Sequence, residues 1–237
     1  MKRLIVGLAA VMVLNWALVE AKAGTIFFDD FDDGNADGWV FPVNSGMSQG
    51  PGQWSVENGA LAQEYFGDNN VGLVDDLILS DQVIEAQVRT TRGYAGFAFW
   101  YQQVDDTLAN YVAMSNWSTG NARVVEFTDG QAAVYYYPAP RFDDTDWRFY
   151  DWKVEADSAT GAMTVYLDDT YVFTHTVTTP YRTGLSGVYS GNEHGYFDDF
   201  RLTDDIAPIP EPSTLVTFTG LLGMGMIGYG WRRRWKR

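Results

Sequence analysis

Short runs rich in β-branched and aromatic residues, separated by turn signals, restrict the fold of this chain more than any other feature. Residues 83–88 read V-I-E-A-Q-V and residues 94–100 read Y-A-G-F-A-F-W. No apolar period of 3.6 residues, the mark of an amphipathic helix, occurs in this part of the chain. About a dozen short strands without helices between them predict an antiparallel β-sandwich or barrel. Further predicted strands are 111–115, 122–127, 132–137, 147–156, 163–167, 171–176, 184–189 and 196–202.

Two turn sequences predict where neighbouring strands reverse direction. Asp168-Asp169-Thr170 lies between two predicted strands, and Glu57-Asn58-Gly59 lies between Trp54 and Leu61. Asn, Asp and Gly tolerate the positive φ angles that tight hairpin turns need. We therefore predict a β-hairpin at each of these turns.

The first 23 residues predict a targeting segment. Met1-Lys2-Arg3 precedes an apolar run over residues 4–19, and Ala21-Lys22-Ala23 puts small residues before Gly24. A basic start, a short apolar centre and an A-x-A site are typical of a secretory signal peptide. We expect residues 1–23 to be a signal helix that is removed on export. A membrane anchor and an ordinary buried helix are the alternatives.

The C-terminal segment, residues 205–237, predicts a second targeting signal. Pro210-Glu211-Pro212 precedes an uncharged apolar run over residues 214–231, and residues 232–237 are strongly basic. The run is near the lower length limit for a transmembrane helix, and its glycines are better tolerated in a membrane than in a soluble helix. The basic tail would stay on the cytoplasmic side, so the body would lie outside.

These three parts, in this order, resemble the PEP-CTERM sorting signal. The resemblance implies recognition by an exosortase, a membrane enzyme that removes the tail after a transient stay in the inner membrane, with Pro210, Glu211 and Pro212 as the recognition residues. It also implies a Gram-negative bacterium that makes extracellular polysaccharide, with the protein ending on the cell surface or in that matrix. A plain C-terminal anchor that is never processed is the alternative.

The composition of the body excludes several classes of function. Residues 24–209 hold 8 of the basic and 29 of the acidic residues, a net charge near −21. Such a body does not suit nucleic acid, which binds by phosphate neutralisation, or anionic lipid surfaces. The chain has no cysteine, which excludes disulfides, thiol nucleophiles and cysteine metal sites. With only two histidines, a multi-histidine zinc site would need carboxylates.

The order of landmarks in residues 25–203 adds a second resemblance. D-D-F-D-D-G-x-x-D-G-W opens at Asp29, W-x-V-x-N-G-x-L follows at Trp54, and G-L-S-G-V-Y-S and F-D-D-F-R-L end the region. This order resembles the concanavalin A-like lectin/glucanase superfamily, in its LamG-like branch. The resemblance implies a jelly-roll β-sandwich over residues 24–204.

The resemblance also implies a metal site. In the superfamily the first and last strands run together and a calcium ion often bridges them. That arrangement would bring Asp30 or Asp32 near Asp198, and calcium takes several oxygen ligands from carboxylates and carbonyls. We expect one structural calcium held by these residues. The alternative is a solvated acidic turn beside charges that protect an edge strand.

Catalysis finds little support in the sequence. The glucanases of the superfamily carry a compact E-x-D-x-x-E strand, whereas the candidate strand at residues 84–89 has Glu85 followed by Gln87 and Arg89. There is no G-x-S-x-G nucleophile motif. We therefore expect that the protein is not an enzyme. Glycoside hydrolysis needs a pair of carboxyl groups, and a pair contributed by two separate strands is the alternative.

Glycan binding is the predicted function of the body. Sugar rings stack on exposed aromatic faces, and the candidates are Trp117 in a polar loop and Tyr135 and Tyr137 in the Y-Y-Y-P run, with His194 as a loop contact. Most other aromatics, including Trp100 and Trp152, are expected in the core. We predict a non-catalytic, exported surface or matrix protein that binds extracellular polysaccharide. A secreted polysaccharide hydrolase or lyase and a purely structural coat protein are the alternatives.

Overall fold

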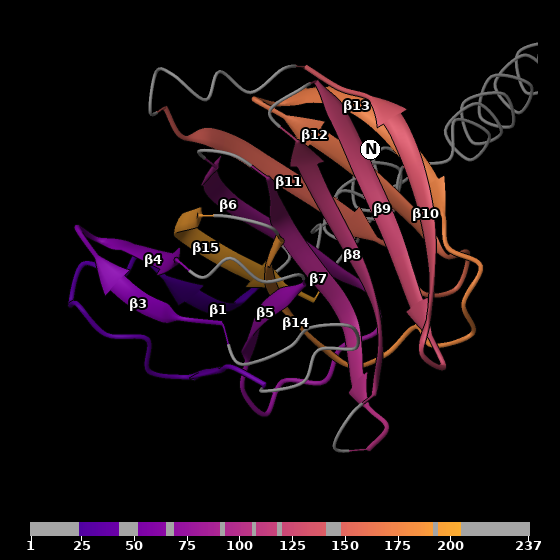
Figure 1. Cartoon of the computed structure of the whole chain (residues 1–237), viewed down its shortest axis with the longest axis horizontal. Coiled ribbons are helices and arrows are strands. Elements are labelled where there is room, and N and C mark those ends of the chain that lie inside the picture. Colours follow the sequence, from indigo (N-terminus) through magenta and orange to yellow (C-terminus); the bar gives the residue numbers. More distant parts are fainter. Residues whose placement is uncertain are drawn as a thin grey trace, which may run out of the picture. The chain divides into compact units, whose positions relative to one another are not determined.

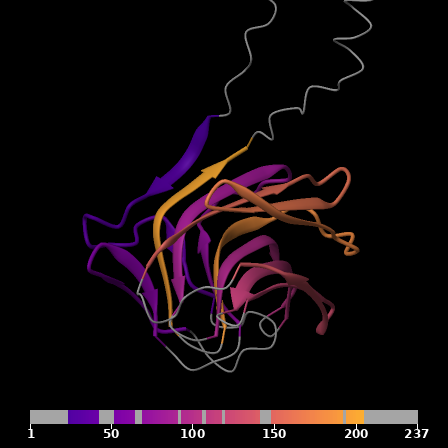
Figure 2. The ribbon, with the colours of Figure 1, turned by 90° about the horizontal axis from the view of Figure 1, so that it is seen from above.

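The computed structural model describes residues 24–42, 52–64, 69–90, 93–105, 108–117, 120–140, 148–191 and 194–204, with only the backbone of Trp117. Within these ranges fifteen strands form two antiparallel sheets that face each other (Figure 1, Figure 2), and there is no helix. The predicted all-β antiparallel sandwich is confirmed.

The predicted targeting segments fall outside the described ranges. The chain divides into two compact units after Ile206, and the second unit contains no described residue. The signal helix predicted at residues 1–23 and the transmembrane helix predicted at residues 214–231 stay predictions. No helix in the described part of the chain has the length and apolar character that crossing a bilayer requires.

One sheet has eight strands and contains the first and the last strand of the body. Buried and more exposed side chains alternate along most of its strands, as the two-residue period of a strand requires. In spatial order its strands are β13 (Thr170–Thr176), β12 (Ala162–Leu167), β11 (Tyr150–Ala156), β6 (Gln82–Thr90), β15 (Gly195–Thr203), β4 (Ala60–Gln63) and β3 (Trp54–Glu57), and β1 (Thr25–Asp29) also pairs with β15.

The other sheet has seven strands and lies toward the viewer in Figure 1. Its central strands β7 (Tyr94–Gln103), β8 (Ala109–Trp117) and β9 (Asn121–Thr128) are long, and most of their described side chains are buried. In spatial order its strands are β10 (Gln131–Pro138), β9 (Asn121–Thr128), β8 (Ala109–Trp117), β7 (Tyr94–Gln103), β14 (Leu185–Gly191), β5 (Asn70–Val74) and β2 (Trp39–Val40).

The first and last strands of the body run side by side (Figure 2), as the superfamily resemblance implied. Asp29 ends β1 and is the anchor of the acidic motif that follows it. Its carboxylate accepts hydrogen bonds from the Phe31 backbone at 2.9 Å and from the Trp39 indole at 2.8 Å. Phe31 is fully buried with a φ of 52°. The first aspartate of the motif therefore fixes the turn that seats Phe31 and Trp39 in the core.

The main core fills the space between the sheets. It includes Trp100 and Trp152, which are 0% and 3% exposed, so their predicted core placement is confirmed. Both predicted hairpins are also present. Asn58 and Gly59 join β3 to β4, and residues 168–169 join β12 to β13, all with positive φ. Two consecutive positive φ angles are the signature of the tight turn that matches strand twist.

A second apolar cluster lies on the outer face of the seven-stranded sheet, the face turned away from the eight-stranded sheet. Alternation along the strands separates the two clusters: in β7, Phe97 belongs to the main core and Ala98 to the second cluster. All members of the second cluster come from strands of this one sheet. They are Val71, Leu73, Tyr94, Ala98, Tyr101, Ala109, Tyr111, Ala113, Val125, Phe127 and Tyr189, with Val40 and Leu185 packed against them.

A β-bulge in β7 extends this outer face. Phe99 and Trp100 both point into the main core, and the register with β8 shifts between Phe99 and Gln102. Trp100 takes a φ of 55°, which is unusual for a bulky residue. The indole of Trp100 donates to the Ser80 carbonyl at 2.6 Å. The extra residue reverses the alternation, so that Tyr101 turns to the outer face.

Candidate functional site

The outer faces of the two sheets carry very different charge. The eight-stranded sheet presents Glu85, Lys153 and Arg201 as neighbours across β6, β11 and β15. The strands of the seven-stranded sheet contain only two charged residues, Arg123 and Glu126. Glu126 points inward, because its carboxylate bonds to His175 of the opposite sheet. Arg123 is therefore the single charge that these seven strands place on their outer face.

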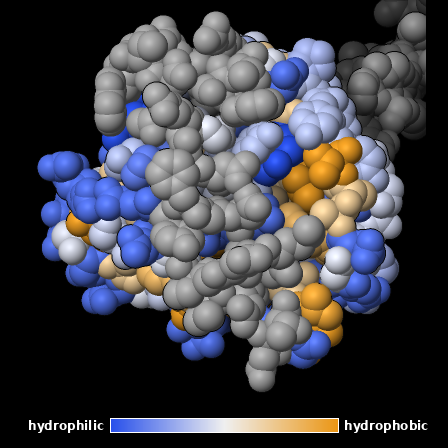
Figure 3. Space-filling model, viewed as in Figure 1, coloured by the Kyte–Doolittle hydropathy of each residue, from blue (hydrophilic) through white to orange (hydrophobic). Residues whose placement is uncertain are grey.

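Strand register places small residues across the middle of this outer face. One cross-strand row runs from Tyr136 through Arg123, Ser115 and Gly96 to Tyr189. Gly96 cannot be replaced without moving the sheet, because a Cβ there would lie 2.1 Å from the Met114 carbonyl oxygen. The next row is Val134, Val125, Ala113, Ala98, Gly187 and Leu73. A hydrophobic area over β9 and β10 is visible in Figure 3. Val134, on β10, is 44% exposed.

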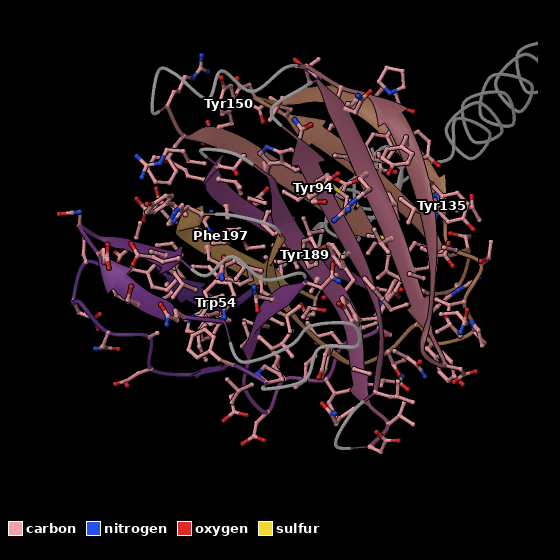
Figure 4. All side chains as sticks on the ribbon, in the orientation of Figure 1. Trp54, Tyr94, Tyr135, Tyr150, Tyr189 and Phe197 are labelled. Atoms are coloured by element: carbon pink, nitrogen blue, oxygen red, sulfur yellow. The ribbon has the colours of Figure 1, made fainter. Side chains whose placement is uncertain are left out.

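Arg123 is the centre of an aromatic and polar group on this face. Its guanidinium carbon lies 3.5 Å from the centroid of the Tyr94 ring, and its Nη2 donates to the Tyr189 hydroxyl at 2.7 Å. Tyr189 in turn donates to the Asn69 side chain at 2.5 Å. Tyr94 and Tyr189 come from β7 and β14, which are neighbours in the sheet (Figure 4). The two tyrosines thus hold the guanidinium in one orientation.

A hollow of about 460 Å³ lies at one end of the same face, where β5 ends and β14 begins. Tyr101 and Leu185 connect it to the second apolar cluster. The lining combines an aromatic ring with hydroxyl, amide and carboxylate groups, the mixture that orients polar ligands in protein pockets. The lining residues are Asp75, Asp76, Ile78, Tyr101, Gln102, Gln103, Thr183, Gly184 and Leu185.

The polar groups in this hollow differ in how they are used. Tyr101 donates to the Gln103 side chain at 2.5 Å, and burial raises the pKa of Tyr101 to about 12, so it remains a hydrogen-bond donor. Gln102 donates to the Thr183 carbonyl at 2.6 Å. Asp75 and Asp76 are exposed, and no side chain in the described ranges pairs with either carboxylate. These two carboxylates are open acceptors.

The structure places Tyr135 and Tyr137 on the inner side of β10, where both pack against the main core. The Tyr135 ring centroid is 4.7 Å from the His175 ring, and the Tyr137 hydroxyl lies 2.7 Å from His175 Nδ1. Tyr136, between them, points outward and is 62% exposed. Strand side chains alternate between the two faces, so Tyr136 is the tyrosine of this run that is open to solvent, and a sugar contact stays a prediction for Tyr135 and Tyr137.

His175 and Glu126 form a buried pair that links the two sheets. His175 Nε2 is 2.9 Å from the Glu126 carboxylate, and the two side chains are 4% and 3% exposed. Burial alone would raise the pKa of Glu126, but hydrogen bonds from His175, Thr178 and Thr179 outweigh it and leave that pKa below its ordinary value. This pair serves the fold, since it faces the interior.

The other two glycan-binding candidates lie apart from this group. The backbone of Trp117 ends β8 and pairs with Tyr94, which puts it at the Arg123 end of the sheet. The side chain of Trp117 lies outside what the structure describes. His194 is half-buried just before β15, and its carbonyl accepts a hydrogen bond from Thr90 at 3.2 Å. A glycan contact stays a prediction for both.

The charges of the predicted calcium ligands Asp30 and Asp32 act on the third predicted ligand, Asp198. Burial, together with the charges of Asp199, Asp32 and Asp30, raises the pKa of Asp198 above its ordinary value. A cation would relieve this crowding. No group of three or more His, Asp or Glu side chains in the described ranges is arranged to hold a metal, so backbone carbonyls would have to supply further ligands. The calcium site therefore stays a prediction.

A group of carboxylates also lies on the other sheet. A hollow of about 340 Å³ on the outer face of the eight-stranded sheet is lined by Glu85, Asp151, Asp169 and Asp199, beside two cations. Lys153 and Arg201 flank Glu85 across the strands. The outer face of the seven-stranded sheet offers no carboxylate from its strands.

Sequence reasoning did not identify Arg123, Tyr94, Tyr189 or the hollow around Tyr101 as a site. One signal was available: in A-R-V-V-E, Arg123 alternates with the apolar residues Ala122 and Val124 in a predicted strand. The sequence pattern also indicated that Tyr94 and Ala98 lie on the face of their strand opposite to Phe97. The sequence did not indicate that Arg123, Tyr94 and Tyr189 lie together, because the order of the strands in the sheet brings them together.

Comparison with solved structures shows the fold. The chain is similar to the carbohydrate-binding module CBM66 from Bacillus subtilis, with a TM-score of 0.57 and 20% identity over 71% of this chain and 97% of that one. It is similar to a β-glucanase from Bacillus licheniformis, with a TM-score of 0.54 and 14% identity over 77% and 99%. The laminarinase catalytic domain from Thermotoga maritima gives 0.54 and 13% over 78% and 99%.

Comparison with protein families identifies the C-terminal signal. No curated protein matches this chain. Residues 208–234 match the PEP-CTERM protein-sorting motif, which indicates exosortase-sorted export with a membrane-associated step. The chain is therefore a jelly-roll β-sandwich, similar in fold to carbohydrate-binding modules and glucanases, that carries a PEP-CTERM protein-sorting motif.

Proposed function

We propose that this protein is an exported surface or matrix protein of a Gram-negative bacterium that binds extracellular polysaccharide without cleaving it. The sorting motif supports export, and the jelly-roll fold is compatible with binding and with hydrolysis alike. The signal peptide and the removable tail complete the proposed route. After exosortase removes the tail, the acidic body remains outside the cell.

The observation that carries glycan binding is the hollow at the Tyr101 end of the seven-stranded sheet. Sugars present hydroxyl groups that need both donors and acceptors, together with apolar C–H patches that pack on aromatic and aliphatic side chains. The hollow supplies acceptors in Asp75 and Asp76, amides in Gln102 and Gln103, and an apolar wall that includes Ile78, which is 72% exposed. Exposed apolar groups beside unpaired polar ones are typical of a ligand site.

The seven-stranded sheet offers binding chemistry but no acid pair. A glycoside hydrolase needs two carboxyl groups about 5–9.5 Å apart, one of them able to donate a proton. The strands of this sheet place no carboxylate on the outer face, and Asp75 and Asp76 are adjacent residues in an exposed turn. Binding is therefore the function that this face supports best.

A polysaccharide pull-down with the full chain tests the proposal. Asp75→Asn combined with Asp76→Asn removes both charges, and Asn tolerates the φ of 55° at position 76. We expect this double variant to lose at least tenfold in affinity for the polysaccharide that the native chain retains. Glu85→Gln with Asp151→Asn is the matched control on the other sheet and should bind as the native chain does. Equal binding by both double variants would reject the hollow as the site.

The second candidate function, polysaccharide hydrolysis or lysis, has one observation in its favour: the acidic hollow around Glu85 and Asp199 on the eight-stranded sheet. Release of new chain ends from a polysaccharide, abolished by Glu85→Gln, would establish it in place of binding. A purely structural coat role would be left if the chain neither retained nor cleaved polysaccharide, and surface enrichment was lost on deleting residues 209–237.

A further inference from the structure

Arg123 is a half-buried cation without a counter-ion in the described ranges. The ion pairs found there join Arg148 to Asp168, Lys153 to Glu155 and His175 to Glu126, and none includes Arg123. The guanidinium stays charged at every physiological pH. Acidic residues are plentiful in this body, so the missing partner does not reflect a shortage of carboxylates. The seven strands of this sheet place none of them on the outer face.

The guanidinium is held ready for a ligand on one edge. The Tyr94 ring covers one side of its plane at 3.5 Å, and the Tyr189 hydroxyl occupies Nη2. Asn69 fixes Tyr189 in turn. A guanidinium stacked on an aromatic ring keeps its plane while its remaining N–H groups stay available. Nε has no hydrogen-bond partner and is shielded from solvent, whereas the Arg123 residue as a whole is half-buried.

Ser115 adds a second unused donor beside it. Ser115 pairs with Arg123 across β8 and β9, so their side chains are direct neighbours on the outer face. Its hydroxyl is fully buried and has no hydrogen-bond partner. Buried polar atoms in native proteins nearly always have partners, and an exception calls for a missing water, ion or ligand. Two such atoms at adjacent positions define one small polar centre.

We propose that Arg123 and Ser115 bind the carboxylate of an acidic sugar, so that the glycan recognised by this protein contains uronic acid residues. This inference rests on the proposed glycan-binding function and names the class of glycan. A carboxylate supplies the counter-charge that a half-buried guanidinium lacks, and the fork of N–H groups matches its two oxygens. A neutral sugar would satisfy the hydrogen bonds and leave the charge uncompensated.

The geometry also limits how many acidic sugars are read. Arg123 is the only charge on the outer face of these strands, and residues 24–209 carry a net charge near −21. The body as a whole repels a dense polyanion, although charges beyond about 8–10 Å are screened at physiological salt. One carboxylate is bound at Arg123, and neighbouring sugars contact the uncharged surface, including exposed Tyr136 in the same row.

The test measures binding of the full chain to oligogalacturonate and oligomannuronate, and to the same oligomers after reduction of their carboxyl groups. We expect at least one uronate to bind at least tenfold more tightly than its reduced form. Arg123→Gln should remove that preference and leave affinity for the reduced oligomer within twofold. Arg123→Lys should keep part of the preference, since it keeps the charge and loses the fork. Arg148→Gln, at an exposed ion pair on the other sheet, is the matched control and should change nothing.

Two readouts keep the test decisive. Affinity for the uronate should fall as salt is raised, and this dependence should be weaker in Arg123→Gln. Ser115→Ala, a smaller change, should weaken uronate binding by a few-fold without changing the melting temperature. Equal affinity for uronate and reduced oligomers, or an equal loss for both in Arg123→Gln, would overturn the inference while leaving glycan binding intact. Binding to no glycan at all would overturn both.

Discussion

The hydroxyl of Tyr137 lies 2.7 Å from Nδ1 of His175, across the space between the two sheets. The other ring nitrogen of His175 lies 2.9 Å from the carboxylate of Glu126, which also accepts hydrogen bonds from Thr178 and Thr179. Strand β10 and strand β13 are the edge strands of their sheets at this side of the sandwich. The contact joins the two edges where no further strand protects them.

Breaking this link should destabilise the fold strongly. His175→Ala removes one of the hydrogen bonds of a buried carboxylate, which costs about 1–3 kcal/mol. Tyr137→Phe removes one hydrogen bond and keeps the ring stacked on Phe173, so it should cost about 1–3 kcal/mol. Denaturant unfolding of the full chain measures both. A loss below about 1 kcal/mol for His175→Ala would show that the pair contributes little.

The same pair predicts a pH dependence. The pKa of Glu126 is lowered in the folded state, so the ionised carboxylate stabilises the protein above its ordinary pKa of 4.5. This contribution is lost as the pH falls through the lowered folded value. The difference in unfolding free energy between native chain and Glu126→Gln should be constant near neutrality and shrink below about pH 4.5. A difference that grows on acidification would contradict the assignment.

Calcium should act through Asp198. The pKa of Asp198 is raised, chiefly by burial, so without metal its ionisation opposes folding as the pH rises above its ordinary value. Asp198→Asn should therefore leave the metal-free melting temperature unchanged or raise it. If calcium binds here, it should raise the melting temperature of the native chain and not that of the variant. No calcium heat and no calcium-dependent rise in the native chain would reject the site.

The sorting motif predicts a processing defect. Replacing Glu211 by Ala should leave the body folded and keep the C-terminal tail attached, because recognition of Pro210-Glu211-Pro212 precedes its removal. The mass of the membrane-bound protein in the producing cell distinguishes processed from unprocessed chain. Normal removal of the tail in the variant would show that Glu211 is not needed for recognition.

Strand alternation accounts for much of the fold that the sequence predicted, and a bulge shows why it did not account for the rest. Alternation alone puts Phe99 and Tyr101 on the same face of β7. The structure places them on opposite faces, because Trp100 takes a positive φ and adds one residue to the strand. The hollow at Tyr101 depends on that single dihedral angle, which no hydrophobic pattern reveals.

Pairing between distant segments was the other limit. In the Y-Y-Y-P run, alternation required Tyr136 to oppose Tyr135 and Tyr137, but which set faced outward depended on how β10 packs against His175 on the other sheet. The sequence also did not reveal that Asp29, next to the predicted calcium ligands Asp30 and Asp32, accepts a hydrogen bond from the Trp39 indole. Both features depend on side-chain contacts between residues on different strands, which the sequence pattern does not reveal.

Retention of the full chain on polysaccharide, with an assay for new chain ends in the same sample, distinguishes binding without cleavage from hydrolysis. We expect the native chain to be retained and no chain ends to appear. Asp75→Asn with Asp76→Asn should abolish retention, while Glu85→Gln with Asp151→Asn should not. Chain ends that appear with the native protein and vanish with Glu85→Gln would contradict binding without cleavage, as would failure to bind any polysaccharide.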